Sequence, residues 1–170
     1  NANLSGVSFK NTNLNGAILV AANLSGSNLS LELNSWDYSV DFQNADLKGA
    51  NFRDANFSLV DENIRDGFCS KVSRAPGESG LNYLSPNFSG ADLSDANFSG
   101  ADLFGVSFRD GSLSNTDFSG ADLRTTLFNR VDLTGANLSG VNFSSGRKCG
   151  VFFEYVQLWI TDFSGANLSH

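Results

Sequence analysis

Residues Pro86–Gly105 read PNFSG-ADLSD-ANFSG-ADLFG, and this stretch decides the fold. Its period continues to Leu168: counting every fifth residue from Phe88, sixteen of seventeen positions are Leu or Phe, the exception being Lys148. A compact residue stands two places before each of these centres. A period of five matches neither an α-helix nor a plain strand. The repeat therefore predicts a coil built from five-residue sides.

A coil of this kind explains which residue types recur. If each pentapeptide forms one side of a square, four sides close a turn after about twenty residues, and stacked turns bury a continuous apolar column. The central Leu or Phe and the small residue two places earlier would point inward. The Asp or Asn before each centre and the Ser-Gly after it would face water or form the corner, because these residues bond locally to the backbone or tolerate unusual dihedral angles.

The repeat units resemble a known family. Ala-Asp-Leu-Ser-Asp, Ala-Asn-Phe-Ser-Gly and Ala-Asn-Leu-Ser-Gly are similar to the A(D/N)LXX pattern of the pentapeptide-repeat family, over Asn1–Ser30, about Val40–Ser58, and Pro86–His170. The resemblance implies an all-β fold, a right-handed quadrilateral β-helix that forms a single domain over residues 1–170. It implies no particular activity, because one fold serves many functions.

Two segments interrupt the repeat. Leu31–Ser39 is expected to form a bulged corner that carries Trp36 and Tyr38, which either fold over the flank of the rod or form an interaction patch. Leu59–Ser85 is a longer insertion, and insertions of this length tend to be functional or disordered.

The chain has two cysteines, Cys69 in the long insertion and Cys149 near the end of the repeat. We hypothesise that they form a disulfide that holds the insertion along the rod. The alternative is two free buried thiols. A disulfide would indicate an oxidising compartment.

Lys148 would fall in a column with Phe88, Phe108, Phe128 and Leu168 if the count of five ran unbroken. A buried lysine is unfavourable, so we expect Ser144–Gly150 to bulge outward.

The next ten residues, VFFEYVQLWI, place large apolar side chains at outward or corner positions. An exposed apolar patch is typical of a binding surface, although the long insertion could cover it instead. The predicted partner-binding residues are Phe152, Tyr155, Trp159 and Ile160, with Trp36 and Tyr38 as a second contact.

The net charge of −7 and the pI near 4.5 argue against direct binding of nucleic acid, which needs a basic surface. The coil predicts one outward column of Asp102, Asp122, Asn142 and Asp162, which could bind a cation or imitate a line of phosphates. Some pentapeptide-repeat proteins protect DNA gyrase by resembling duplex DNA. The simpler interpretation is that Asp and Asn are the ordinary outward residues of the repeat.

No enzyme, cofactor or metal site is predicted. The one histidine is His170, so the sequence offers no internal Ser-His-Asp triad and no histidine metal site. No apolar run is long enough to cross a membrane.

The acidic charge, the two cysteines and the opening without an initiating Met resemble pentapeptide-repeat proteins of the thylakoid lumen. That resemblance implies a non-catalytic structural or protein-interaction subunit, a rigid rod docking on a larger assembly on the lumenal side of a photosynthetic membrane complex. The expected location is the thylakoid lumen or the bacterial periplasm. The alternative is an acidic DNA-mimic rod that binds and protects a type II topoisomerase.

Overall fold

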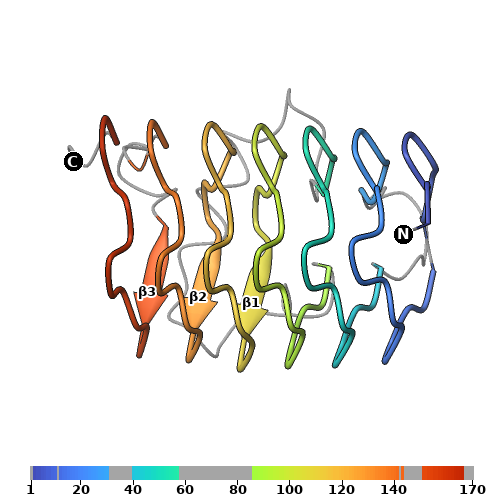
Figure 1. Ribbon diagram of the computed structural model, residues 1–170, viewed down its shortest axis with the longest axis horizontal. Helices are drawn as coiled ribbons and strands as arrows, with labels where there is room; N and C mark the ends of the chain where they lie inside the picture. The colour runs from blue at the N-terminus through green and yellow to red at the C-terminus, as the bar shows by residue number, and fades with distance from the viewer. Residues whose placement is uncertain are drawn as a thin grey trace.

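The computed structural model describes residues 2–10, 12–30, 40–57, 86–141, 143 and 151–166. These residues form a stack of similar coils (Figure 1). Three short strands lie on one side of the stack: β1 (Ser107–Arg109), β2 (Leu127–Asn129) and β3 (Phe152–Glu154). They pair in parallel in the order β1-β2-β3. No helix of the described residues is long and apolar enough to cross a membrane.

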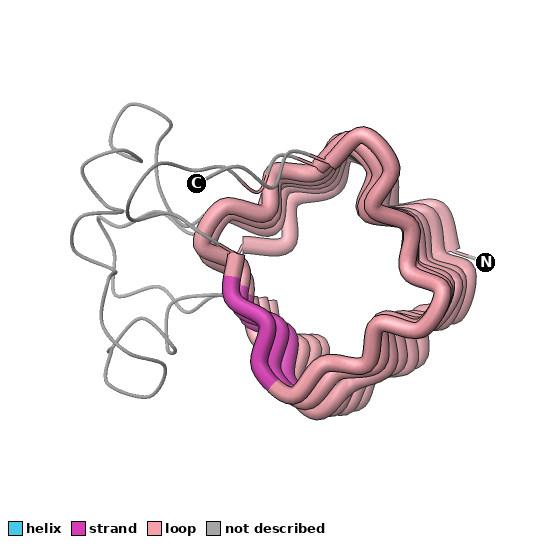
Figure 2. Tube along the Cα trace, turned by 90° about the vertical axis from the view of Figure 1, so that its left-hand side faces the viewer, coloured by secondary structure: helices cyan, strands magenta, loops and turns pink. Residues whose placement is uncertain are grey.

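Four ladders of parallel bridges hold the coils together, one on each side of the coil seen end-on (Figure 2). Each ladder is named here by its order along the chain. The first joins Asn3, Asn23, Asn51, Asn97, Asp117, Asn137 and Asp162. The second joins Ser8 to Asn28, Asn56, Asp102 and Asp122; the third runs from Asn13 through Asp41, Asn87 and the three strands; the fourth joins Ile18, Asp46, Asp92, Ser112, Asp132 and Gln157.

The uninterrupted bridges, such as Asn87 with Ser107 and Asp102 with Asp122, join residues twenty apart. The predicted twenty-residue turn and all-β architecture are therefore confirmed for the described residues. The right-handed sense of the coil stays a prediction.

Most corners are tight turns in which the central residue of the side accepts a hydrogen bond from the amide three residues later. Ala91 N, for example, donates to Phe88 O at 3.1 Å. The residue two places after each centre has a positive φ, 71° at Gly90 and 61° at Asp95. This combination is the geometry of a type II turn, which explains why Gly, Asn and Asp recur there.

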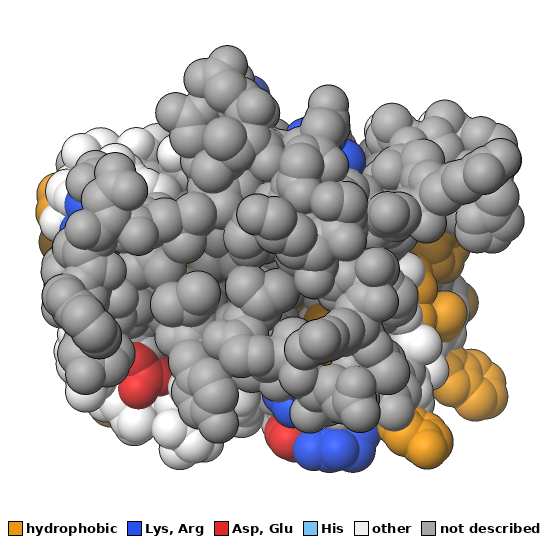
Figure 3. Space-filling model, turned by 180° about the vertical axis from the view of Figure 1, so that it is seen from behind, with side chains coloured by type: hydrophobic (Ala, Val, Ile, Leu, Met, Phe, Trp, Pro, Cys, Tyr) orange, Lys and Arg blue, Asp and Glu red, His pale blue; other side chains and the backbone are white. Residues whose placement is uncertain are grey.

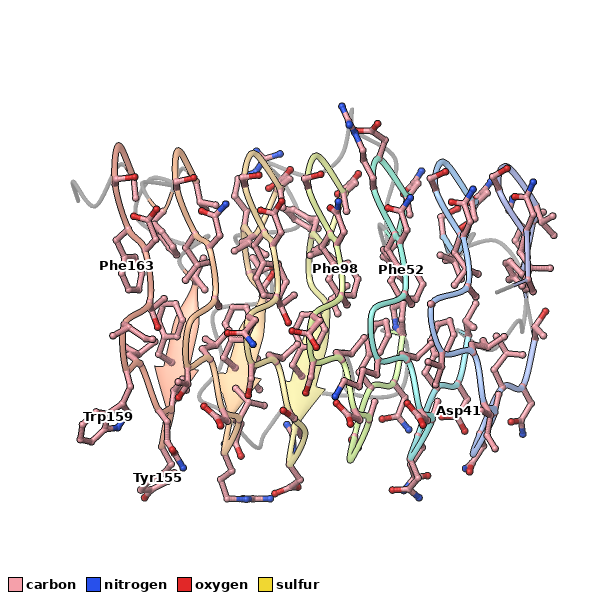
Figure 4. The ribbon with its side chains drawn as sticks, viewed as in Figure 1. Asp41, Phe52, Phe98, Tyr155, Trp159 and Phe163 are labelled. Carbon is pink, nitrogen blue, oxygen red and sulfur yellow. The ribbon has the colours of Figure 1, made fainter. Side chains whose placement is uncertain are left out.

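Phenylalanine rings form columns on two opposite sides of the shaft, and leucines and small residues fill the remainder. On the third side, Phe42, Phe88, Phe108, Phe128 and Phe153 stack with ring centroids 4.9, 5.1, 5.3 and 5.2 Å apart. On the first side, Phe52 stacks on Phe98 at 4.8 Å (Figure 4). The columns meet edge to face across the shaft, as Phe88 and Phe98 do at 87°. Offset stacks and edge-to-face pairs are the favoured arrangements of aromatic rings.

The column containing Phe128 corrects one prediction. Phe128 is in register with Phe153, twenty-five residues later, so Phe153 and not Lys148 continues the column. The bridges Asp132–Gln157 and Asn137–Asp162 show the same longer spacing. Phe143 still packs against the core, so the five additional residues fall between Phe143 and Val151. This register covers the buried ring of Phe128 with the ring of Phe153 and avoids placing a lysine there. Lys148 itself lies outside the described residues.

The three interruptions of the repeat join the coil at one corner, between the second and third ladders. The described residues at the junctions are Ser30 and Val40, Phe57 and Pro86, and Phe143 and Val151. The corner after the fourth ladder is diagonally opposite these junctions (Figure 2). Leu31–Ser39, Leu59–Ser85, Cys69 and Cys149 lie outside the described residues, and the disulfide stays a prediction.

Truncating a ring in the middle of a stack tests the origin of stability. Phe98 is fully buried between Phe52 and Phe118. We expect Phe98→Ala to lower the free energy of unfolding by about 3–5 kcal/mol, since it leaves a cavity that the rigid coils cannot close. Urea unfolding followed by circular dichroism measures the loss. The control Ser99→Ala changes the neighbouring turn residue and should stay within about 0.5 kcal/mol of the parent; equal losses in both variants would contradict the stacked core.

Candidate protein-interaction surface

Three large side chains project from the last described coil. Tyr155, Trp159 and Ile160 are 79%, 74% and 87% exposed. We call these three residues the aromatic patch. Apolar side chains gather at this end of the molecule (Figure 3), where Tyr155 and Trp159 point away from the coil (Figure 4). Such large apolar side chains are uncommon on a free surface when they gather in one place.

The backbone holds the patch at two successive corners. Tyr155 and Ile160 each lie two residues after a centre, with φ of 53° and 49°. Most other described residues at this turn position are Gly, Asn or Asp. A positive φ is strained for a bulky residue and most strained for a β-branched one. Ile160 is therefore costly both in backbone conformation and in exposure to water, and strain of this kind often marks a functional position.

The coil beneath the patch is well ordered by hydrogen bonds. Trp159 O accepts a bond of 2.8 Å from Gly135 N on the preceding coil. The shaft residues Phe153 and Leu158 are also partly exposed at this end. They extend the apolar surface inward from the corners.

The structure describes the side chains of three of the six predicted partner-binding residues. Tyr155, Trp159 and Ile160 are exposed and lie together on the last described coil. Phe152 contributes its backbone to β3, and its side chain lies outside the described part of the structure. Trp36 and Tyr38 also lie outside it. The binding role of all six stays a prediction.

Sequence reasoning missed a second apolar cluster at the other end of the rod. Ile18 is 81% exposed, and Val20 beside it is also exposed. Ile18 occupies a position in the fourth ladder where Asp46, Asp92 and Asp132 stand in later coils. An isoleucine in a column of acidic residues was the signal that could have identified it.

The predicted acidic column is only partly correct. Asp102 and Asp122 do pair in the second ladder, but Asp162 pairs with Asn137 in the first. The prediction was wrong for Asp162 because it assumed a constant twenty-residue spacing across the interruption between Phe143 and Val151. Asn142 lies outside the described residues.

The outward Asp and Asn residues stabilise the turns of the coil. The Oδ1 of Asp102 accepts the amide of Phe104 at 3.3 Å, and that of Asp122 accepts the amide of Arg124 at 3.1 Å. The same bond from the amide two residues later recurs at Asp92, Asp117, Asp132 and Asp162, where it closes the turn at the corner. The Arg124 side chain also pairs with Asp122 at 2.7 Å.

Hydrogen bonding keeps several carboxylates ionised. The Ser94 hydroxyl donates to Asp92 at 2.6 Å and lowers the pKa of that carboxyl, against the opposing effect of burial. The side chain of Thr134 and then its amide lower the pKa of Asp132 in the same way. The Arg130 guanidinium, which bonds Asp110 at 2.6 and 2.7 Å, lowers the pKa of Asp110. These bonds favour the charged form of each group.

Among the described residues, no three His, Cys, Asp or Glu side chains group closely enough to hold a metal ion. The carboxylates are spread along the ladders, where they bond to turn amides, hydroxyls and guanidinium groups. The exposed side chains therefore offer apolar contact and negative charge as their main chemistry.

Comparison with known proteins gives a consistent picture of the fold. A family model for pentapeptide repeats, in eight copies, matches residues 1–30, 38–61, 87–110 and 112–144, which is more than half of the chain. No curated protein sequence matches significantly.

Several solved structures are similar. HetL, a pentapeptide repeat protein involved in heterocyst differentiation regulation from the cyanobacterium Nostoc sp. strain PCC 7120, is 20% identical with a TM-score of 0.51, over 98% of this chain and 68% of HetL. The trypsin-treated plasmid-mediated fluoroquinolone resistance protein QnrB1 is 14% identical with a TM-score of 0.40, over 99% and 84%. A pentapeptide repeat protein from the Arabidopsis thaliana thylakoid lumen is 18% identical with a TM-score of 0.23, over 99% and 62%. The similarity to HetL shows the fold alone.

The carboxylate networks predict acid sensitivity. A carboxyl whose pKa is lower in the folded than in the unfolded chain stabilises the fold above its unfolded pKa, near 3.9, and this stabilisation is lost as pH falls through the folded pKa. Asp92 and Asp132 both have lowered pKa values. We expect the variant Asp92→Asn/Asp132→Asn to be less stable than the parent at pH 7, with the difference closing below about pH 4.

Urea unfolding between pH 7 and pH 2.5 measures this difference. The control Asp95→Asn removes one negative charge from the adjoining turn and leaves both networks in place. A difference that stays constant down to pH 2.5 would contradict the assignment.

Replacing Ile160 by glycine tests the strain in the patch. At a φ of 49°, glycine removes the clash of the side chain with the backbone, so we expect Ile160→Gly to raise the free energy of unfolding by about 1 kcal/mol. Urea unfolding measures the gain. Ala166→Gly, at an ordinary position of the same coil, is the control and should lower stability. A loss of stability in Ile160→Gly would show that the isoleucine is not strained.

Proposed function

The chain belongs to the pentapeptide-repeat family, and from this premise we propose that it is a non-catalytic rod that binds a protein partner through the aromatic patch. The observation that carries the proposal is the exposure of Tyr155, Trp159 and Ile160 on consecutive corners, two of them at a positive φ. Aromatic side chains that can be desolvated in a partner's pocket commonly supply most of the binding energy of an interface.

Rigidity is the second part of the proposal. Parallel ladders bond each described coil to the next, and the rings on the third side of the shaft stack without interruption from Phe42 to Phe153. A rod of this kind loses little conformational entropy on binding, which favours its use as a spacer or docking subunit of a larger assembly.

We place that assembly on the lumenal side of a photosynthetic membrane, or in the bacterial periplasm, as a finer proposal. Its supports are the net charge of −7 and the two cysteines, which suit an oxidising compartment if they are joined. A membrane-protein complex would then be the partner.

A second candidate is an acidic rod that imitates DNA and binds a type II topoisomerase. The pairing of Asp102 with Asp122 and the negative net charge favour it. Two observations argue against it. Asp162 lies in a different ladder from Asp102 and Asp122, and Arg124 neutralises the charge of Asp122. Competition by duplex DNA would identify this mode of binding, since DNA would occupy the same site on the enzyme.

The test is affinity capture from detergent-solubilised membranes and from soluble extract of the source organism, with partners identified by mass spectrometry. We expect Tyr155→Ser/Trp159→Ser to lose the partner, at least a tenfold drop in recovery, with the circular dichroism spectrum unchanged. The matched control is Arg53→Ser, which removes a long exposed side chain from a corner elsewhere on the rod. Undiminished recovery by the double variant would contradict the proposed site.

The same capture separates the two candidates. A membrane complex as partner, with Cys69 and Cys149 joined when the protein is analysed without reductant, supports the lumenal docking subunit. Recovery of a topoisomerase that duplex DNA displaces, with both thiols free, supports DNA mimicry.

A further inference from the structure

The two exposed apolar clusters lie on one edge of the rod. Ile18 begins the fourth ladder, and Gln157, next to Leu158 and Trp159, ends it. The corner after this ladder is equally continuous. Ala21 N donates to Lys48 O, Gly49 N to Ser94 O, Asp95 N to Ser114 O, Asn115 N to Thr134 O, and Gly135 N to Trp159 O. Val20 and Trp159 are therefore the first and last residues of one corner column.

The separation of the clusters follows from the stacking. Five bridges connect Ile18 to Gln157 through Asp46, Asp92, Ser112 and Asp132. At the usual spacing of about 4.8 Å between neighbouring strands, the clusters are about 24 Å apart. The coils stack in a nearly straight row, so the edge between them is straight (Figure 1).

The edge is acidic between its apolar ends. Asp46, Asp92 and Asp132 project from the fourth ladder, and Asp95 lies on the following corner, with Lys48 as the cation among them. The carboxylates of Asp92 and Asp132 are held ionised by their hydrogen bonds. A partner lying along this edge gains from positive charge in its middle.

The edge is also the part of the coil farthest from the junctions of the three interruptions, which join at the diagonally opposite corner. Along it the repeat runs without additional residues, so the ladder from Ile18 to Gln157 presents one unbroken surface. The corner after the fourth ladder is thus free of interruptions in the described residues, whereas all three interruptions join the coil at the opposite corner.

We propose that this edge is a two-point docking surface for one α-helix of a partner protein, about 24 Å long, apolar at both ends and basic between them. The inference deepens the proposed function and rests on it, because Trp159 and Ile160 form one of the two contact points. The second contact point is Ile18 with Val20.

A helix fits this surface better than a strand does. The amides and carbonyls of this corner are already bonded from coil to coil, so a strand laid along the edge would find no row of unpaired backbone groups. A helix satisfies its own backbone bonds, and about 16 residues span 24 Å. Its Lys or Arg side chains would face Asp46, Asp92 and Asp132.

Three synthetic sixteen-residue helical peptides test the proposal. The first carries leucines at both ends and lysines between them on one face. The second has the same composition with all leucines at one end, and the third has glutamate in place of lysine. Fluorescence anisotropy of the labelled peptide gives the Kd for the folded protein.

We expect the first peptide to bind at least about tenfold more tightly than either control peptide. Ile18→Ser should raise its Kd about tenfold, as loss of one apolar anchor does, and Asp92→Asn/Asp132→Asn should raise its Kd and weaken its dependence on salt. Asn15→Ser, an exposed change on another corner of the first coil, is the matched control. No preference among the peptides, no binding of any of them, or an unchanged Kd in Ile18→Ser would overturn the proposal.

Capture of the natural partner keeps this proposal separate from the proposed function. If Tyr155→Ser/Trp159→Ser loses the partner and Ile18→Ser retains it in full, the two-point surface is wrong and the aromatic patch remains a binding site. If both variants retain the partner in full, the proposed function fails as well. Loss of the partner in both variants, with unchanged circular dichroism, supports the two-point surface.

Discussion

Stacking of ring on ring along the shaft is the interaction on which the rest of the structure depends. Each phenylalanine of the third side, from Phe42 to Phe153, lies on the one below it at about the spacing of neighbouring strands. A coil with one residue too many on any side would displace every later ring from its stack. Additional residues can therefore leave the coil only as complete excursions at a corner. The described residues on either side of all three interruptions lie between the second and third ladders.

The need for tight corners in every coil explains most of the outward Asp and Asn residues without a role in binding. Asp and Asn recur there because Oδ1 closes the next corner by accepting its amide, as in Asp102 and Asp122. Much of the net charge of −7 is thus a by-product of turn chemistry. The informative outward residues are the ones that cannot perform this task. Ile18 accepts no such bond, and Tyr155 and Ile160 occupy turn positions that suit Gly, Asn or Asp.

The period of five was enough to predict the sides, the buried centres and the turn residues, because each depends on local spacing. Register across an interruption was not predictable in this way. Counting by fives placed Lys148 over Phe128 and Asp162 with Asp122, whereas the structure places Phe153 over Phe128 and Asp162 beside Asn137. Stacking of Phe153 on Phe128 accounts for the register there. Such a contact joins residues on different coils, so a count along the chain does not predict it. Exposure of the aromatic patch was predicted, but Ile18 was not, because its meaning depends on the acidic residues stacked beside it.

The corner that carries the three interruptions and the edge opposite it are related through the stacked rings of the shaft. A stacked coil tolerates insertions only where they leave the stacked rings undisturbed. In this chain all three interruptions begin and end at the same corner. The diagonally opposite edge has an uninterrupted ladder from Ile18 to Gln157. Both of its ends are apolar and costly to expose to water. Strain at Ile160 adds to that cost, since glycine would serve the turn better. The proposed contact with a partner would offset the cost of exposing Ile160, because it would remove that side chain from water.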